Sequence, residues 1–180
     1  AHLPGIIRQA RAVPWGRPIR PPIPGVDNPC VHVLRNVPDM DRIIAQLDQG
    51  ASRAVVIGGS YIGLEVAEAF RDRGLHTTIV ERTDQLMPWL DHEMTRILHY
   101  HVHSHDVDCR LGTAATAIRA DGDALAVDLA DGASLKTDIV VLAVGVRPNV
   151  ELAHAAGLQI GPRGGIVVDA QMRTSAPDIL

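Results

Sequence analysis

The stretch "RAVVIGGSYIGLEVAEAF", residues 53 to 70, restricts the possible folds of this chain more than any other feature. An apolar run over residues 54–57 ends in a glycine-rich turn, and a helical pattern follows over residues 61–73. A run that is apolar throughout is typical of a parallel strand buried on both faces. The stretch therefore predicts a strand, a tight turn and a helix.

A second strand is predicted at "HTTIVE", residues 76–81, directly after this helix. A strand, a helix and a parallel strand within about thirty residues form a right-handed crossover, the unit of an α/β sheet. The positions that we expect to face inward on the helix are Ile62, Val66, Ala69 and Phe70.

The remaining pattern extends this sheet. A helix over about 91–104 precedes a third strand at 107–112, two alternating stretches at 114–119 and 124–129 meet at an Asp-Gly turn, and "DIVVLAVG" returns as a strongly apolar strand ending at Gly145. We therefore predict an α/β fold: a Rossmann-like parallel sheet with helices on both faces and a small antiparallel β addition.

Two segments precede the glycine turn. Residues 1–30 are rich in proline, which predicts extended connecting chain. From Asp39, a possible cap, to Gly50, a stop, the pattern predicts a short surface helix. Its apolar face is expected to hold Met40, Ile43, Ile44 and Leu47.

The composition excludes several classes of partner. With 180 residues, 46% of them hydrophobic, the chain can bury one core, and a formal net charge of -4 offers no basic surface for nucleic acid or anionic membranes. We find no apolar run of the ~20 residues that span a bilayer and no secretion signal, so we expect a cytoplasmic protein. Cys30 and Cys109 are far apart in sequence and are expected to be plain buried thiols.

The glycine turn departs at one position from the dinucleotide fingerprint G-x-G-x-x-G. Gly58 allows the tight turn, Ser60 stands where the middle glycine lets backbone approach the pyrophosphate, and Gly63 permits close packing of helix on strand. Gly59 adds a second flexible residue beside the middle position. The Ser60 hydroxyl could donate to a phosphate, and the helix beginning near Tyr61 presents free N–H groups, so the substitution perturbs the site without abolishing it.

An acidic residue strengthens this interpretation. Glu81 follows Gly63 by 18 residues, close to the spacing of about twenty at which a carboxylate accepts from the adenosine ribose hydroxyls. The same charge would repel a 2′-phosphate and so favours NAD(H) over NADP(H), although Arg82 could offset that repulsion. The plainer alternative is a strand–helix turn with a surface glutamate.

The motifs together resemble one family, the FAD-dependent pyridine nucleotide-disulfide oxidoreductases, in particular the branch of coenzyme A disulfide reductases and NADH oxidases. The resemblance extends from about Pro18 to Leu180. It rests on "PIRPPIPGVD", "LRNVPDMDRI", "VVIGGSYIGLEVAEAF", "TIVER", "LAVGVRPN" and "GGIVVDAQMRTSAPDI", which follow one another in family order.

The resemblance implies roles for three residues. Tyr61 matches an aromatic residue that covers the flavin, and Glu65 matches an acid near the carboxamide end of nicotinamide. Gly145 matches a glycine where any side chain would intrude on the cofactor. The alternatives are a half-buried residue at a helix start for Tyr61 and a simple turn glycine for Gly145. The cofactor-binding residues expected in all are Gly58, Gly59, Ser60, Tyr61, Ile62, Gly63, Glu65, Glu81, Arg82 and Gly145.

The family's FAD fingerprint, its catalytic cysteine and its flavin-binding Gly-Asp pair do not occur in this sequence. We therefore expect residues 1–50 to be a connecting segment and partial FAD-domain remnant, 51–151 the NAD(P)-binding domain, and 152–180 a truncated return segment towards the FAD domain. Such a chain would bind a nicotinamide nucleotide, retain no FAD, carry no catalytic residue and lack turnover by itself, with the FAD domain of the parent protein as its partner.

Five histidines lie on the helix over about 91–104 or at its end. The pairs His99/His103 and His101/His105 have the i, i+4 spacing that can chelate a metal, but no third ligand is evident, and a solvated helix face is favoured over a metal site.

Two other functions remain open from the sequence. One is a stand-alone nucleotide-binding regulatory or structural module. The other, a short dehydrogenase acting directly on a substrate, would need an acid–base residue such as a Tyr-Lys pair, and Lys136 is the only lysine.

Overall fold

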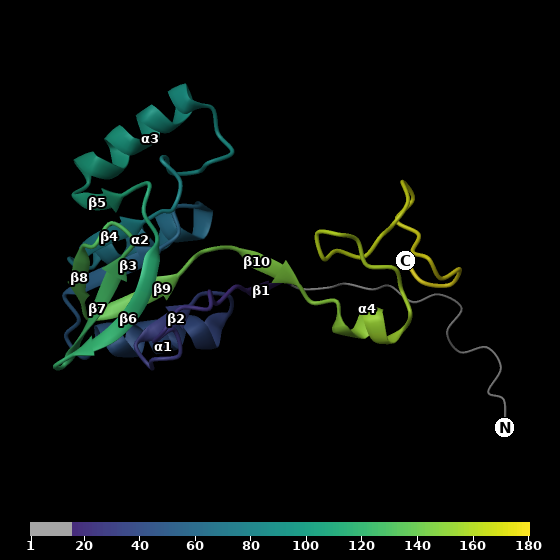
Figure 1. The fold of residues 1–180 in the computed structure, drawn as a ribbon, viewed down its shortest axis with the longest axis horizontal. Helices are drawn as coiled ribbons and strands as arrows, with labels where there is room; N and C mark the ends of the chain where they lie inside the picture. Colours follow the sequence, from purple (N-terminus) through teal and green to yellow (C-terminus); the bar gives the residue numbers. More distant parts are fainter. Residues whose placement is uncertain (1–15) are drawn as a thin grey trace. The chain divides into compact units, whose positions relative to one another are not determined.

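The computed structural model of the protein describes residues 16–180, so Pro4 and Pro14 of the expected connecting segment lie outside the described residues. The described chain divides into two compact units, one over residues 18–145 and one over residues 16–17 and 146–180. The elements in chain order (Figure 1) are β1 (Gly16–Pro18), β2 (Val31–Val33), α1 (Val37–Leu47), β3 (Arg53–Ile57), α2 (Tyr61–Asp72), β4 (His76–Val80), α3 (His92–Ser104), β5 (Val107–Arg110), β6 (Ala115–Asp121), β7 (Ala124–Leu129), β8 (Ser134–Thr137), β9 (Ile139–Leu142), β10 (Val146–Pro148) and α4 (Glu151–Ala155).

A five-stranded parallel sheet in the order β2-β9-β3-β4-β5 forms the centre of the larger unit. Val56 of β3 pairs with Ile79 of β4 on one side and Val141 of β9 on the other. The predicted strands β3, β4, β5 and β9 are confirmed. The edge strand β2 was missed, because its three residues follow proline-rich chain and are too short to show a pattern.

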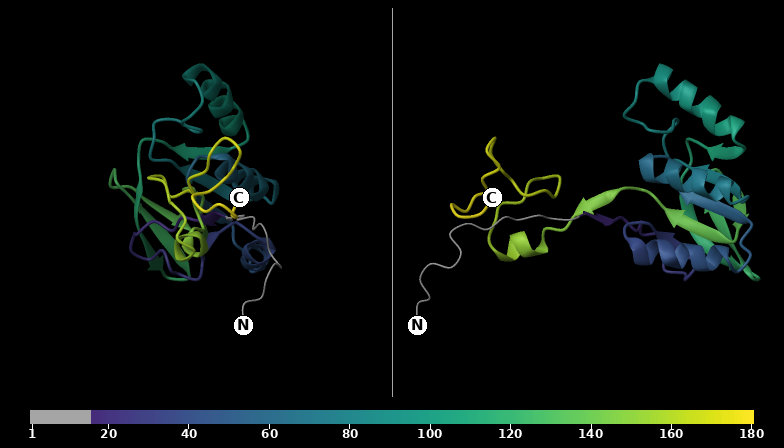
Figure 2. Two further views of the ribbon diagram at one scale, coloured as in Figure 1. Left: turned by 90° about the vertical axis from the view of Figure 1, so that its right-hand side faces the viewer. Right: turned by 180° about the vertical axis from the view of Figure 1, so that it is seen from behind.

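The two faces of this sheet are covered differently. Ala54 and Val56 pack with buried residues of α1, α2 and α3, whereas Val55 and Ile57 pack with buried residues of β6 and β7. The rear view shows α1 and α2 on the same side of the sheet (Figure 2). The predicted α/β class, with a Rossmann-like parallel sheet and an antiparallel addition, is confirmed. The expectation of helices on both faces differs from the structure, in which a separate sheet, β6-β7-β8, covers the second face.

Helix α1 begins earlier than the sequence pattern indicated. Asn36 is the N-cap, and its side-chain oxygen accepts from the backbone N–H of Asp39 at 2.9 Å. The Asp39 carboxylate accepts in return from the N–H of Asn36 at 3.2 Å, which completes a capping box. The prediction of Asp39 as the cap was therefore wrong by three residues. Ile43 is the buried apolar residue of the helix, while Met40 is exposed.

Helix α2 packs on the sheet through a slightly different face than predicted. Its buried residues are Gly63, Val66, Ala67 and Phe70. Val66 and Phe70 were predicted correctly, but Ala69 is exposed and the Ile62 side chain is 40% exposed. The pattern misled because Gly63 and Ala67 are small enough for close approach to β3, which turns the buried face towards them.

The smaller unit contains β1, paired with β10, and the helix α4. Arg17 and Glu151 form an ion pair at 2.9 Å, and Arg173 and Asp169 form another at 2.7 Å. An isolated bridge between Ile160 and Ile166 closes a turn further along the chain. Pairing of the distant strands β1 and β10 and a few ion pairs and turns thus hold this unit together.

Candidate nucleotide site

The turn between β3 and α2 lies against the end of β9. Gly58 has φ of +111°, and a Cβ on it would lie 2.4 Å from the Ala143 carbonyl oxygen. A Cβ on Gly63 would lie 1.9 Å from the carbonyl oxygen of Gly58. Both glycines are therefore required by close backbone approach, as the fingerprint interpretation predicts.

Ser60, the residue in the middle fingerprint position, is the N-cap of α2 in extended conformation. Its hydroxyl donates to the Ala143 carbonyl oxygen at 3.3 Å, and its oxygen accepts no N–H of the helix. The first N–H groups of α2 have no acceptor within the helix, and they mark the positive end of its dipole. This helix end has the geometry that binds anions such as a pyrophosphate.

Glu81, directly after β4, has its carboxylate beside the same turn. One oxygen accepts from the N–H of Gly59 at 2.7 Å, and the other accepts from the N–H and the hydroxyl of Thr83, each at 2.9 Å. A carboxylate has about four lone-pair positions and these donors use three, so one ribose hydroxyl can still donate to Glu81. The next residue, Arg82, is exposed.

The loop from Arg82 to Leu90 also contacts the glycine turn, which the sequence did not predict. The N–H of Met87 donates to the Gly59 carbonyl oxygen at 2.9 Å, and a Cβ on Gly59 would lie 2.5 Å from the Cδ2 atom of Leu86. The ring of Trp89 lies 5.3 Å from that of Tyr61, centroid to centroid. The sole signal of this loop in the sequence is the apolar run "LMPWL" soon after the acid.

Three predicted residues of α2 share a groove. Tyr61, Ile62 and Glu65 line a cavity of about 450 Å³ whose other wall is formed by residues 34–37 and Met40. The exposed apolar side chains in it include Tyr61 and Val37. The groove at the start of α2 is therefore largely apolar, whereas the carboxylate of Glu81 lies beside the glycine turn.

Gly145 lies three residues beyond the end of β9, with φ of +114°. A Cβ there would meet only the Cδ1 atom of Ile19, at an ordinary 3.6 Å. The backbone conformation therefore favours glycine at this position, and the carbonyl oxygen of Gly145 is fixed by the N–H of Ile19 at 2.9 Å.

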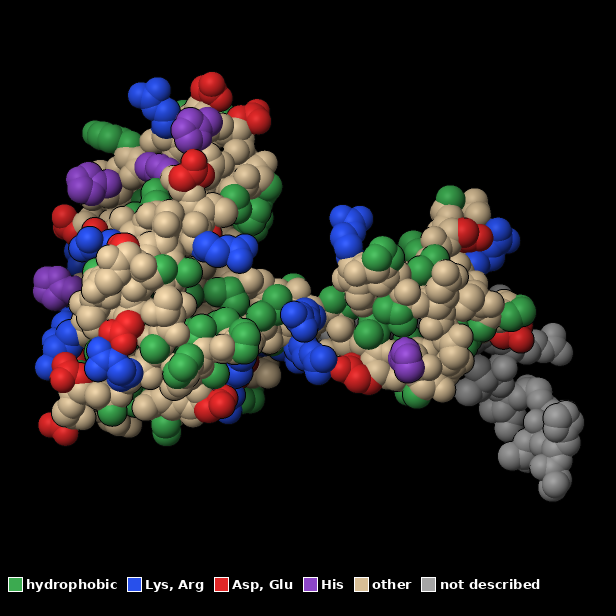
Figure 3. All heavy atoms as spheres, in the orientation of Figure 1, with side chains coloured by type: hydrophobic (Ala, Val, Ile, Leu, Met, Phe, Trp, Pro, Cys, Tyr) green, Lys and Arg blue, Asp and Glu red, His purple; other side chains and the backbone are tan. Residues whose placement is uncertain are grey.

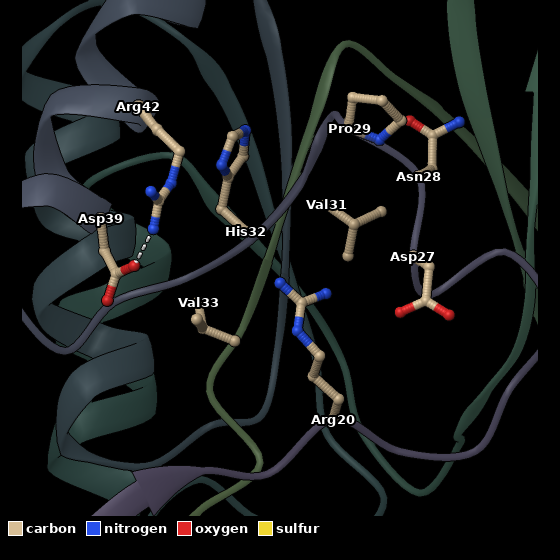
Figure 4. A pocket seen from close by; sticks show the side chains of 9 residues that line it. All are labelled: Arg20, Asp27, Asn28, Pro29, Val31, His32, Val33, Asp39 and Arg42. Carbon is tan, nitrogen blue, oxygen red and sulfur yellow. Dashed lines mark hydrogen bonds and ion pairs between the residues drawn. The ribbon is translucent and has the colours of Figure 1, made fainter.

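A second cavity, of about 350 Å³, lies between the chain before β2 and helix α1 (Figure 4). Its polar groups are largely used by the fold: Arg42 pairs with Asp39, Arg20 donates to the carbonyl oxygen of Val26 at 2.9 Å, and His32 Nε2 lies 2.5 Å from the Gln46 side-chain oxygen. We assign it no part in the site at the glycine turn.

The histidines of α3 form the cluster visible over that helix in Figure 3. The Nε2 atom of His99 accepts from the N–H of Leu86 at 3.0 Å, so His99 does not form a chelating pair with His103 in this conformation. The rings of His101 and His105 lie 4.3 Å apart, centroid to centroid. Within residues 16–180 no group of three or more His, Cys, Asp or Glu side chains is arranged to hold a metal ion.

The two cysteines are free thiols. Burial, with a smaller contribution from Asp108, raises the pKa of the Cys109 thiol to about 11. At neutral pH this thiol is protonated and unreactive. Among the helices that the structure describes, none has the length and hydropathy needed to cross a bilayer.

These features define a class of protein. Strand β3 continues through α2 to β4 on one side and has β9 on the other, so the glycine turn lies at the switch point where Rossmann-like sheets bind dinucleotides. Residues 13–180 match the model of one such family, described as "Pyridine nucleotide-disulphide oxidoreductase", and the chain belongs to that family.

Relatives within the family are longer proteins. The chain is 40% identical to the large subunit of a nitrite reductase [NAD(P)H] of Klebsiella oxytoca, over 91% of this chain and 17% of that protein. It is 35% identical to an NADH oxidase of Enterococcus faecalis, over 90% of this chain and 36% of the oxidase. The chain thus spans much less than half the length of these relatives.

Solved structures give the same assignment. An NAD-dependent persulfide reductase from A. fulgidus superposes with a TM-score of 0.87 at 38% identity, over 91% of this chain and 30% of that one. The reduced CoADR-RHD of Bacillus anthracis gives a TM-score of 0.86 at 41% identity, over 91% and 29%. The fold and the predicted branch of the family are therefore confirmed.

Proposed function

We propose that the chain is the NAD(H)-binding domain of a flavin-dependent pyridine nucleotide-disulfide oxidoreductase, in which NAD(P)H delivers hydride to FAD in the intact enzyme. The observation that carries the proposal is the position of the Glu81 carboxylate, 2.7 Å from the N–H of Gly59 in the turn that begins α2. An acceptor for ribose and a helix end for pyrophosphate thus lie side by side, which is what a dinucleotide requires.

The division of labour follows from the two ends of the site. Glu81 holds the adenosine ribose, and the N–H groups that begin α2, with Ser60, hold the pyrophosphate. Gly58, Gly59 and Gly63 keep the turn free of side chains that would occupy its space. The nicotinamide end lies in the groove of Tyr61, Ile62 and Glu65. Gly145, after β9, adds no side chain at the carboxyl ends of the strands.

The bound nucleotide supplies the hydride, and the chain's own residues bind and orient it. The apolar walls of the groove offer the nicotinamide end an apolar surface, and Glu65 offers an acceptor for a carboxamide N–H. Residues 51–151 form the greater part of this domain in the proposal, and β2 and α1, which lie within the expected connecting segment 1–50, complete its sheet and its groove. Residues 152–180 are proposed to connect it to an FAD domain. We expect the 180-residue chain to retain no flavin and to lack turnover by itself.

The preference for NADH over NADPH rests on Glu81, whose charge would repel a 2′-phosphate. Two solved relatives support this reasoning: a water-forming NADH oxidase from Lactobacillus brevis bound to NADH, and an engineered water-forming NADPH oxidase made from it and bound to NADPH. The engineered protein has adjacent aspartate-to-alanine and alanine-to-arginine changes. In this chain the acid Glu81 is followed by Arg82, so the acid that opposes NADPH is retained.

The test is titration of the purified chain with NADH and with NADPH by calorimetry. We expect NADH to bind more tightly, and Glu81→Gln to weaken NADH about tenfold while narrowing the difference from NADPH, since one charge-assisted hydrogen bond contributes about 1.4 kcal/mol or more. Glu68→Gln, which changes an exposed acid of α2, is the matched control. Failure of the wild-type chain to bind either nucleotide would contradict the proposal, and tighter binding of NADPH would contradict only the argument from Glu81.

A further inference from the structure

We propose that His99 of α3 is a positioning residue for the nucleotide site, because its neutral imidazole holds the loop from Arg82 to Leu90 against the glycine turn. This inference rests on the proposed function for its effect on nucleotide binding. His99 touches neither the glycine turn nor Glu81 in the contacts described above, and it acts through Leu86.

Leu86 is the residue that connects α3 to the turn. It is fully buried, and its N–H donates to the His99 Nε2 atom at 3.0 Å. Its side chain packs so closely on Gly59 that a Cβ there would lie 2.5 Å from the Leu86 Cδ2 atom. A buried N–H needs an acceptor, so replacing His99 by a side chain that cannot accept would force the loop to move away from Gly59.

The residues on either side of Leu86 contact the groups that would face the nucleotide. Met87 donates its N–H to the Gly59 carbonyl oxygen at 2.9 Å, and Thr83 donates twice to the Glu81 carboxylate. A shift of Leu86 would therefore disturb both the turn that receives pyrophosphate and the acid that receives ribose.

Besides the hydrogen bond from Leu86 to His99, a second contact joins the loop to α3. The Gln85 side-chain oxygen lies 2.6 Å from His92 Nδ1, and the Gln85 amide donates to the Leu90 carbonyl oxygen at 2.9 Å. Gln85 thus holds the side of the loop next to Leu86 to His92 and to Leu90, whereas His99 holds the N–H of Leu86, the residue in contact with Gly59. Loss of His99 alone should loosen the loop without detaching it.

The protonation state agrees with this role. An imidazole nitrogen accepts a hydrogen bond only when it carries no proton, so His99 must be neutral with its proton on Nδ1. Burial lowers the pKa of His99, and the nearby His92 lowers it further. Both effects keep the acceptor intact at neutral pH.

The experiment compares three variants of the full 180-residue chain in a Trp15→Phe background, in which Trp89 is the remaining tryptophan. His99→Leu removes the acceptor with little loss of volume, His99→Gln restores an acceptor oxygen, and His103→Gln is a control on an exposed position of the same helix. NADH dissociation constants are measured by quenching of Trp89 fluorescence and by calorimetry.

We expect His99→Leu to raise the NADH dissociation constant about tenfold and to shift the Trp89 emission of the free chain. His99→Gln should stay within about threefold of wild type, and the His103 variant should be unchanged. Wild-type affinity in His99→Leu, or an equal loss in the Leu and Gln variants, would overturn the proposal.

A measurement on the wild-type chain keeps the proposal testable if His99→Leu does not fold. Nitrogen-15 NMR of the histidine side chains at pH 7.5 should show His99 with its proton on Nδ1 and the Leu86 amide protected from exchange. A proton on Nε2 would overturn the proposal. If the wild-type chain binds no NADH, the proposed function fails, while the tautomer and the Trp89 shift still report whether His99 holds the loop.

Discussion

The polar groups at the two ends of the parallel strands, called here the amino edge and the carboxyl edge of the sheet, have opposite uses. At the amino edge, Asp138 before β9 accepts from the N–H groups of Ser52 and Arg53 at 3.0 and 2.9 Å and pairs with the Arg53 guanidinium at 2.5 Å. At the carboxyl edge, α2 begins with N–H groups that lack intrahelical acceptors beside the Glu81 carboxylate. At the amino ends these groups hold strands together, whereas at the carboxyl ends the first N–H groups of α2 have no acceptor within the helix.

The largest expected effect breaks the carboxyl edge. Gly58→Ala places a Cβ 2.4 Å from the Ala143 carbonyl oxygen in a backbone of φ +111°, so β3 and β9 must separate. We expect the free energy of unfolding to fall by about 3 kcal/mol or more, and NADH binding to be lost. Urea unfolding followed by circular dichroism measures the change.

The control for this variant is Gly165→Ala, at a glycine with ordinary φ and no atom within 4 Å of the added Cβ. It should be close to neutral. Equal stability of the Gly58 variant and wild type would show that the turn tolerates a side chain, and would remove the steric basis of the site.

The next effect breaks the amino edge. Asp138→Ala takes the acceptor from two backbone N–H groups and the partner from Arg53, which should cost about 2 kcal/mol of stability. The NADH dissociation constant should stay within twofold of wild type, because the change lies at the opposite edge. A large loss of affinity in a folded variant would contradict the division between edges.

Protonation of the Asp138 carboxylate at low pH should also reduce the stability of the protein. Hydrogen bonding to Arg53, with backbone donors, holds the pKa of Asp138 well below its usual range. A carboxyl group with a depressed folded-state pKa stabilises the protein above its unfolded pKa of about 3.9, and this contribution is lost as the pH falls below that value. Asp138→Asn should flatten the acid limb of the stability curve by up to about 1.4 kcal/mol per pH unit. An unchanged limb in urea titrations at pH 2 to 5 would assign acid sensitivity to other carboxylates.

The smallest expected effect concerns the choice between NADH and NADPH at the carboxyl edge. Arg82→Ala should weaken NADPH about threefold and leave NADH unchanged, since an exposed charge contributes about 0.6 kcal/mol to binding a 2′-phosphate. Competition calorimetry measures both affinities. Equal losses for the two nucleotides would mean that Arg82 acts on a group common to both.

The sequence predicted the carboxyl edge better than the rest of the molecule. Gly58, Gly63 and Glu81 have demands that are local in sequence, because the turn and the strand after it lie within one crossover unit. The contacts of Leu86, Met87 and His99 depend on how a loop and a helix fold back on that unit, so spacing alone does not reveal them. The sequence pattern also did not predict that helices cover one face of the sheet and antiparallel strands the other. Both kinds of element can cover an apolar strand equally well.

The protonated thiol of Cys109 can serve as a chemical probe of the edge strand β5. With a pKa of about 11, the thiol should be spared by maleimides or iodoacetamide at pH 7 while β5 stays closed. Local opening of β5 would relieve the burial that raises this pKa, so a faster alkylation of Cys109 would report that opening. Slower labelling with NADH bound would show that a ligand at the carboxyl ends of the strands reduces local opening of the edge strand β5.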